Sequence, residues 1–348
     1  MTLEIPEAAA APLLAWYDAN RRTLPWREEP TPYRVWISEI MLQQTRVEAV
    51  KPYYERFLHE LPDVASLAEV DDGRLMKLWE GLGYYSRARN LKKAAQRIVS
   101  NFGGRFPASR EELLSLPGIG DYTAGAIASI AFSQPEPAVD GNVLRVVARL
   151  TACREDVSRP AVKAAVSDAL RRIYPVGRCS DFTQALMELG ALVCLPNGEP
   201  LCDACPWKQL CRARREAAVR EIPVKSAKKP RREDALTVFL LRCGDFAAFH
   251  RRPKSGLLAG MWELPNVAGT LSESAVSALA EEWNLAPKSI APAGEGRHIF
   301  THRQWNMTAF RVECAAMPDV FFWVRRAGFE AELALPSAFR SFLAALWR

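Results

Sequence analysis

The chain of 348 residues contains no apolar run long enough to cross a bilayer, which excludes a membrane-spanning protein. Its N-terminal stretch, MTLEIPEAAAAPLLAWYDAN, has acidic rather than basic residues ahead of its apolar part, which argues against a secretory signal. The sequence also lacks an internal repeat. Hydrophobic residues make up 49% and charged residues 25%, as in globular rather than disordered proteins. We therefore expect a soluble protein located in the cytoplasm.

Basic charge is in small excess, with a formal net charge of +6, but it is unevenly distributed. Between Arg212 and Arg232 there are nine basic residues and only two acids, Glu216 and Glu221. This run is equally consistent with a solvated linker and with a segment that contacts phosphates, and one segment can be both.

The pattern of the chain changes near residue 234. From about residue 8 to 220 it is helical, as in VEAVKPYYERFLHEL, RNLKKAAQRIVSNF and AVKAAVSDALRRIY. Beyond it, ALTVFLLRCGDFAAFHRR predicts two strands around a Gly-Asp turn, RQWNMTAFRVEC another strand, and SESAVSALAEEWNL an amphipathic helix. We predict a multidomain protein of class α plus α+β: an all-α region at 1–221, a basic connector at 222–233 and an α+β region at 234–348.

A glycine-containing turn interrupts the helical region at LPGIGDYTAGAI. Gly118 and Gly120 allow the backbone to turn tightly and to bring its N–H groups close to an anion. No Lys-Ser/Thr follows, as a P-loop requires, and no strand precedes, as a dinucleotide-binding fold requires. The pattern resembles the helix-hairpin-helix element that grips a DNA phosphate. A simple tight turn between two helices is the alternative.

Two carboxylates flank this turn in the sequence. Glu39 in WISEIMLQQT shares a helix face with Val35 and Leu42, where loss of water raises a carboxyl pKa and lets the group act as an acid. Asp140 in AVDGNVLRV is a candidate N-cap, and a capping or hydrogen-bonded aspartate more solvated than Glu39 would stay ionised. Two carboxylates in such different environments fit the cleavage of a glycosidic bond. The alternatives are a solvated helical glutamate and an ordinary helix cap.

Four of the eight cysteines lie within eighteen residues, in CLPNGEPLCDACPWKQLC. These are Cys194, Cys202, Cys205 and Cys211. Structural zinc more often shows two C-x2-C pairs, and here there is one; a proline directly after a cysteine ligand is familiar from four-iron clusters. We expect a [4Fe-4S] cluster in the loop 194–211, with zinc and then four free thiols as alternatives.

Together these motifs resemble the helix-hairpin-helix DNA glycosylases, and specifically the MutY family of adenine DNA glycosylases. The resemblance covers nearly the whole chain. It is carried by RTLPWR (22–27), WISEIMLQQTRV (36–47), GLGYYSRARNL (81–91), LPGIGDYTAGAI (116–127), VDGNVLRV (139–146), the cysteine run, GLLAGMWELP (256–265), FTH (300–302) and ALPSAFRSFL (334–343).

The resemblance implies a role for each matching residue. Glu39 matches the acid that protonates adenine N7, Asp140 the carboxylate facing the anomeric carbon, and Tyr122 and Asn142 residues that support them. Around the extruded adenine and the duplex, the matching positions are Arg22, Trp26, Arg27, Gln184, Gln44, Thr45 and Tyr84. The implied substrate is double-stranded DNA with adenine opposite 8-oxoguanine or G, and the implied protein is a monomer whose connector is a candidate docking segment for repair or replication proteins.

Departures from the family pattern refine this expectation. A bifunctional glycosylase/lyase carries a lysine where this chain has Tyr122, so we expect base excision without strand cleavage. Leu144 stands where some relatives have a lysine, so a side reaction attributed to that amine should be absent. The first cysteine gap is seven residues rather than six, which the surface stretch LPNGEP can absorb.

The carboxyl-terminal region resembles a Nudix fold, an α/β sandwich, without Nudix chemistry. Only Glu281 and Glu282 remain of the acidic motif, and Ser277 and Ala278 replace its Arg and Glu, so magnesium-dependent hydrolysis is not expected. In the family this domain checks the opposite base. Here Thr301 replaces the more usual serine beside His302, which keeps the hydroxyl but adds a methyl group.

Three other functions compete with adenine excision. One is a glycosylase of the same fold with another target, such as thymine in G:T pairs; the carboxyl-terminal region argues against it. Another is a non-catalytic protein that binds lesions, which would need neither Glu39 nor Asp140. The third, a Nudix hydrolase with a DNA-binding extension, conflicts with the degraded acidic motif.

Overall fold

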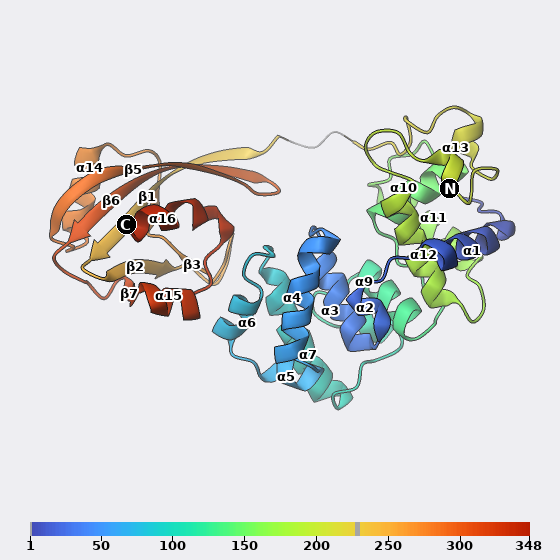
Figure 1. Ribbon diagram of the computed structural model, residues 1–348, viewed down its shortest axis with the longest axis horizontal. Coiled ribbons are helices and arrows are strands. Elements are labelled where there is room, and N and C mark those ends of the chain that lie inside the picture. The colour runs from blue at the N-terminus through green and yellow to red at the C-terminus, as the bar shows by residue number, and fades with distance from the viewer. Residues whose placement is uncertain (1, 227–229) are drawn as a thin grey trace. The chain divides into compact units, whose positions relative to one another are not determined.

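The structure is a computed structural model that describes residues 2–226 and 230–348 (Figure 1). Residues 227–229 of the expected connector lie outside the described residues. The chain divides into two compact units. The first comprises Met1–Val70 and Arg89–Ala227, and the second comprises Asp71–Ala88 and Lys228–Arg348. A short segment of the helical region thus belongs to the same unit as the carboxyl-terminal region.

The first unit is helical, which confirms the expected all-α fold (Figure 1). Proline at the first position of a helix and side-chain caps fix where several of these helices begin, as with Pro32 and Thr31 at the start of α3. Its elements are η1 (Glu7–Ala9), α1 (Ala10–Asn20), α2 (Pro25–Glu28), α3 (Pro32–Leu42), α4 (Val47–Glu60), α5 (Val64–Glu69), most of α7 (Ser86–Phe102), α8 (Arg110–Leu114), α9 (Asp121–Ala126), the π-helix η2 (Ile127–Ala131), α10 (Gly141–Thr151), α11 (Pro160–Arg171), α12 (Cys179–Leu192), η3 (Cys202–Ala204) and α13 (Arg212–Arg215).

One hydrophobic core joins the beginning of this unit to its end. Leu13 and Tyr17 of α1 are buried together with Val147 of α10, Leu170 of α11 and Phe182 of α12. Helix α3 packs separately against α4, α9 and η2. The element that carries Glu39 therefore lies directly against the helix that follows the glycine-containing turn.

The second unit is built on a seven-stranded sheet with the order β3-β2-β1-β6-β5, in which β4 pairs with β1 and β7 with β2. Strands β1 and β6 are parallel over the register from Arg232↔Arg303 to Arg242↔Glu313, and the other pairs are antiparallel. The elements are α6 (Asp72–Leu78), β1 (Arg232–Cys243), β2 (Phe246–Arg251), β3 (Trp262–Glu263), β4 (Asn266–Ala268), α14 (Glu273–Glu282), β5 (Pro287–Ile299), β6 (Arg303–Cys314), β7 (Phe322–Arg325), α15 (Arg326–Glu332), η4 (Ser337–Phe342) and α16 (Leu343–Leu346).

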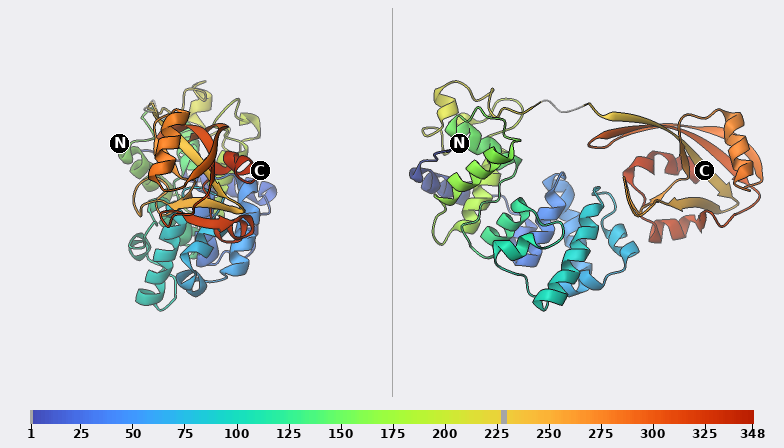
Figure 2. Two further views of the ribbon diagram at one scale, coloured as in Figure 1. Left: turned by 90° about the vertical axis from the view of Figure 1, so that its left-hand side faces the viewer. Right: turned by 180° about the vertical axis from the view of Figure 1, so that it is seen from behind.

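Alternating side chains of β1 build two cores on opposite faces of the sheet. Val238 and Leu240 pack with residues of α15, η4 and α16, whereas Phe239 and Leu241 pack with residues of α14. Figures 1 and 2 show α14 and α16 on the two sides of the sheet. Helices covering both faces of a mixed sheet confirm the expected Nudix-like sandwich.

The strands predicted at ALTVFLLRCGDFAAFHRR and RQWNMTAFRVEC, and the helix predicted at SESAVSALAEEWNL, are all present. Strand β5, along PKSIAPAGEGRHI, had no counterpart in the predicted elements. Among the described residues, no helix combines the length and the apolar character needed to span a membrane.

Candidate active site

Glu39 lies on the buried face of α3, where its residue is only 6% exposed. The Tyr122 hydroxyl, from α9, donates a hydrogen bond to its Oε2 atom. Burial raises the pKa of the Glu39 carboxyl to about 7; the charge of Asp140 adds to this rise, while the Tyr122 hydrogen bond and Arg27 oppose it. Glu39 therefore keeps its proton to a much higher pH than an ordinary glutamate, in the direction that the sequence predicted for a buried acid.

Asp140 is the N-cap of α10 and accepts hydrogen bonds from the Val143 backbone N–H (2.7 Å) and the Asn142 Nδ2 amide (2.8 Å). Burial nevertheless raises the pKa of its carboxyl, against these hydrogen bonds and the charge of Arg145. The expected cap is present, and Asp140 is partly exposed, so it is more solvated than Glu39, as expected. Its hydrogen bonds favour the ionised form of the carboxyl.

Both carboxylates line one cavity of about 460 Å³ within the first unit. This volume falls inside the range of about 300–1,000 Å³ typical of small-molecule sites. The cavity brings together most of the residues singled out in the amino-terminal half of the sequence and one from α12. They are Arg22, Trp26, Arg27, Glu39, Gln44, Thr45, Tyr122, Asp140, Asn142 and Gln184.

Gly118 and Gly120 lie outside this cavity lining, in the hairpin between α8 and α9. Gly118 has φ +79°, and a Cβ atom there would lie 2.7 Å from the Cβ of Asn90 on α7. Only glycine combines this backbone conformation with such close packing. Gly120 is the N-cap of α9, so the hairpin leads directly into the helix that carries Tyr122.

The four clustered cysteines line a second cavity. Cys194 follows α12, Cys202 begins η3, Cys205 is the C-cap of η3, and Cys211 is the N-cap of α13. Burial raises the pKa of the Cys205 thiol to about 12, so a cationic centre is needed for it to become a thiolate. Within the described ranges, no three or more His, Cys, Asp or Glu side chains form a group placed to hold a metal ion.

A chain of hydrogen bonds on α10 leads from the active-site cavity to the cysteine loop. Arg145 Nη2 donates to Asn142 Oδ1 (2.9 Å), and Arg145 Nε donates to the Cys194 carbonyl (2.7 Å). One turn later, Arg149 Nη1 lies 3.3 Å from the Cys194 Sγ atom. Neither arginine stood out in the sequence, because both lie within an apolar helical pattern.

The second unit holds the remaining residues singled out in the sequence. Tyr84 and Thr301 have their hydroxyl oxygens 2.8 Å apart, and His302 is exposed. Tyr84 is a non-glycine residue with positive φ, +48°, as is Gln44 in the first unit, +62°. Such conformations are uncommon and often occur at functional sites. Glu281 and Glu282 are both exposed near the end of α14.

Comparisons with known proteins agree with this architecture. Residues 37–172 match the HhH-GPD superfamily base excision DNA repair proteins, and residues 237–345 match the NUDIX domain. The adenine DNA glycosylase of Schizosaccharomyces pombe is 31% identical over 91% of this chain and 85% of its own length. That of Rattus norvegicus is 36% identical over 83% of this chain and 67% of its own length. The chain belongs to the MutY family of adenine DNA glycosylases.

Two solved structures share the helical fold of this family member. A thermostable thymine-DNA glycosylase is 28% identical, with a TM-score of 0.54, over 60% of this chain and 96% of that chain. An endonuclease III in a non-covalent complex with DNA is 25% identical, with a TM-score of 0.51, over 61% of this chain and 98% of that chain. The chain spans about two thirds of the length of mammalian relatives such as the human protein, of which 64% is matched.

Glu188 lines the cavity as well, although nothing in the sequence had singled it out. It is 1% exposed and accepts hydrogen bonds from Arg22 Nε (2.7 Å), Arg22 Nη2 (2.8 Å) and Arg27 Nη2 (2.9 Å). Burial favours a raised pKa for this carboxyl, but the two arginines outweigh it and lower the pKa to about 2. Glu188 lies one helical turn after Gln184, a spacing that could have identified it.

We expect Glu188→Ala to lower the free energy of unfolding by about 3–5 kcal/mol, because it leaves two guanidinium groups without their buried partner. Urea denaturation monitored by circular dichroism measures this loss. Glu155→Ala, which breaks an exposed pair with Arg159, is the matched control and should change stability by less than about 1 kcal/mol. Equal effects of the two substitutions would show that Glu188 does not hold the arginines in place.

Proposed function

We propose that this protein is a DNA glycosylase that excises adenine paired with 8-oxoguanine, or with G, in duplex DNA. The observation that carries the proposal is the convergence of Glu39, Tyr122 and Asp140 on one cavity, with Glu39 buried enough to retain a proton. Reaching a glycosidic bond in a duplex requires the nucleotide to be extruded from the stack, and the cavity supplies a place for it.

In the proposed reaction, Glu39 gives its proton to adenine N7. The C–N glycosidic bond then breaks with its electron pair leaving on the adenine, and the ionised Asp140 stabilises the oxocarbenium-like sugar until water adds to it. Trp26 and Gln184 line the cavity and are the proposed contacts of the base. Arg27 Nε is a buried donor without a hydrogen-bond partner in the part of the chain that the structure describes.

The proposed activity is monofunctional. Cleavage of the strand by a lyase requires an amine that attacks the sugar and forms a Schiff base. Tyr122 occupies the position of that amine, and none of the described residues that line the cavity is a lysine. The product should therefore be an abasic site in an intact strand.

Recognition of the opposite base is assigned to Thr301, His302 and Tyr84. The hydrogen bond between Tyr84 and Thr301 supports a shared role, because it links two hydroxyl-bearing residues from distant parts of the sequence within the second unit. Gln44 and Thr45 are the proposed wedge that fills the vacated stack. The protein is proposed to act as a monomer on double-stranded DNA inside the cell, with the connector open to repair or replication proteins.

The four clustered cysteines are proposed to ligate a [4Fe-4S] cluster. Soft sulfur donors that share one cavity, and a guanidinium that contacts the Cys194 sulfur, fit an anionic iron–sulfur group. When bound, such a cluster would pin the 194–211 loop and the basic residues that follow it.

Purified protein is expected to be yellow-brown and to contain about four iron atoms per chain, measured by a colorimetric iron assay together with acid-labile sulfide. Cys205→Ser should lose the colour, whereas Cys153→Ser should keep it, because Cys153 is buried away from the loop cavity. A colourless protein with one zinc per chain would contradict the assignment.

A panel of duplexes tests the proposed activity. The protein is incubated with duplexes carrying A:8-oxoguanine, A:G, A:C or G:T pairs, and half of each reaction is heated in alkali. We expect cleavage at adenine opposite 8-oxoguanine and G, only after alkali. Alkali-labile thymine in G:T would favour the alternative specificity, and tight binding without any labile site would favour a lesion-binding protein.

A further inference from the structure

The segment that leads into Asp140 is anchored along its length. The 133–139 loop connects the π-helix η2 to α10. Gln134 donates through its backbone N–H to the Ala128 carbonyl (2.9 Å) and through Nε2 to the Ala108 carbonyl (3.1 Å). The Tyr174 hydroxyl donates to the Glu136 carbonyl at 3.4 Å. These contacts tie the loop to three separate parts of the first unit.

Close packing fixes the end of this loop nearest Asp140. A Cβ atom at Gly125 of α9 would lie 2.3 Å from the Pro137 carbonyl oxygen, so helix and loop backbones touch there. Pro135 and Pro137 restrict φ on either side of Glu136. The loop therefore acts as a stiff connection between the helix that carries Tyr122 and the N-cap of α10.

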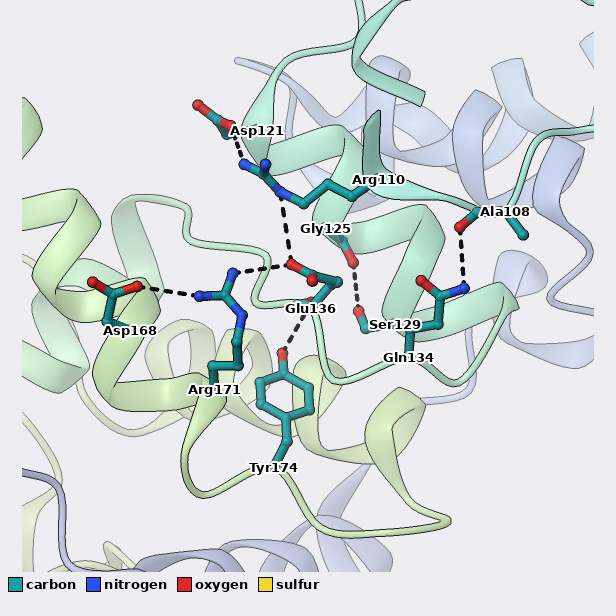
Figure 3. Close-up of polar contacts among 10 residues, drawn as sticks. All are labelled: Ala108, Arg110, Asp121, Gly125, Ser129, Gln134, Glu136, Asp168, Arg171 and Tyr174. Atoms are coloured by element: carbon teal, nitrogen blue, oxygen red, sulfur yellow. Dashed lines mark hydrogen bonds and ion pairs between the residues drawn. The ribbon is translucent and has the colours of Figure 1, made fainter. Parts of the chain in front are cut away.

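Glu136 adds charge contacts to this connection (Figure 3). Its carboxylate lies 3.0 Å from Arg171 Nη2 at the end of α11 and 3.6 Å from Arg110 Nε at the start of α8. The two arginines also pair with Asp121 and Asp168. The Glu136 side chain is 23% exposed, whereas both arginines are about 40% exposed.

Stability alone does not account for this arrangement. Ion pairs as accessible to solvent as these contribute little to stability, so the pairs do little to keep the domain folded. Their geometry instead restrains the position of the loop, because two arginines from different helices hold one carboxylate four residues before Asp140. Small displacements of a catalytic group have large effects on rate, on the order of 10²-fold for 1 Å.

We propose that Glu136 is a positioning residue for the glycosylase reaction: held by Arg110 and Arg171, it keeps the 133–139 loop in place and thereby aims Asp140 into the active-site cavity. This inference rests on the proposed function. It assigns to Glu136 an effect on the chemical step and none on DNA binding, since Glu136 lies outside the cavity lining.

The test is Glu136→Gln, which removes the charge and keeps the length of the side chain. We expect the single-turnover rate of adenine excision to fall about 10-fold. The dissociation constant for a duplex with a non-cleavable adenosine analogue should stay within about twofold, and the melting temperature within about 2 °C. A purely structural role would instead lower the melting temperature and the active fraction, leaving the rate constant of the folded protein unchanged.

Two further variants sharpen the test. Asp168→Asn removes a neighbouring charge but leaves the Glu136–Arg171 contact, and it should keep the wild-type rate. If the contact is the cause, Arg171→Gln should slow excision, and the Glu136→Gln/Arg171→Gln double variant should be no slower than Glu136→Gln alone. A wild-type rate for Glu136→Gln, or additive losses in the double variant, would overturn the positioning role. An inactive wild-type protein would overturn the proposed function and this inference together.

Discussion

Replacing Glu39 with glutamine is expected to reduce the single-turnover rate of adenine excision by about 10²–10⁴-fold, the contribution of a general acid. Glutamine keeps the shape of the side chain and an oxygen for the Tyr122 hydroxyl, but it has no acidic proton to transfer. Binding of the duplex should be retained. Rapid quenching of excess enzyme with an A:8-oxoguanine duplex measures the rate, and fluorescence anisotropy measures binding.

The same substitution should stabilise the protein in alkaline solution. The folded pKa of Glu39, about 7, lies above its ordinary value of 4.5, so the stability associated with neutral Glu39 is full below pH 4.5 and is lost as the pH rises through 7. Glutamine does not ionise and avoids that loss. We expect the free energy of unfolding of Glu39→Gln, relative to wild type, to rise by up to about 3 kcal/mol as the pH increases from 4 to 8.

Glu55→Gln is the matched control for both measurements, because Glu55 is an exposed helical glutamate of the same unit. It should leave the rate and its pH dependence unchanged. If Glu39→Gln excises adenine at the wild-type rate, Glu39 is not the proposed acid. If the difference in stability between the two proteins does not depend on pH, the Glu39 carboxyl does not have a raised pKa.

Asp140→Asn is expected to lower the rate of excision by about 10²–10³-fold, as when one preorganised electrostatic group is removed from a transition state. Asparagine remains a good N-cap, so α10 should begin at the same residue and the protein should stay folded. The charge of Asp140 also raises the pKa of Glu39. The residual excision rate of Asp140→Asn should therefore fall on the alkaline side with a lower apparent pKa than the wild-type rate.

Asp63→Asn is a suitable control for Asp140→Asn. Asp63 is likewise an N-cap that accepts the N–H three residues on, in the exposed start of α5. Asp63→Asn makes the same aspartate-to-asparagine change at a helix N-cap outside the cavity lining, so it should leave the excision rate unchanged. Equal losses from the two substitutions would mean that Asp140 contributes only a helix cap.

The sequence predicted the part of the site that depends on local pattern. Glu39 stood out because an apolar helix face surrounded it, and the structure buries it. Asp140 stood out as a cap, but its meeting with Glu39 and Tyr122 at one cavity depends on long-range packing that no local pattern encodes. The spacing of Glu188 from Gln184 on α12 was a local signal, but its pairing with Arg22 and Arg27 was not, and the contacts of Arg145 with the Cys194 and Gly190 carbonyls had no local signal either. Each is an ordinary charged residue in a helix until partners from elsewhere in the chain approach it.

In the fold, too, the elements with a clear local pattern were predicted and those that depend on distant contacts were not. Strand β1 has a long apolar run and β6 alternates apolar with polar residues, and both were predicted, whereas β5 contains two prolines and two glycines and was not. Its pairing with β6 tolerates them through register shifts at Pro287/Ser289 and Pro292/Gly294. Assignment of Asp71–Ala88 to the second unit likewise arises from distant contacts, such as the Lys77 ammonium with the Leu333 carbonyl (3.1 Å).

The pH dependence of single-turnover excision on an A:8-oxoguanine duplex tests most directly whether Glu39 supplies the proton. Measured from pH 5 to 10, the wild-type rate should fall on the alkaline side with an apparent pKa near 7, because the rate requires protonated Glu39. In Glu39→Gln this alkaline fall should vanish along with most of the rate. A wild-type rate that stays constant to pH 9, or an alkaline fall that persists in Glu39→Gln, would contradict the account.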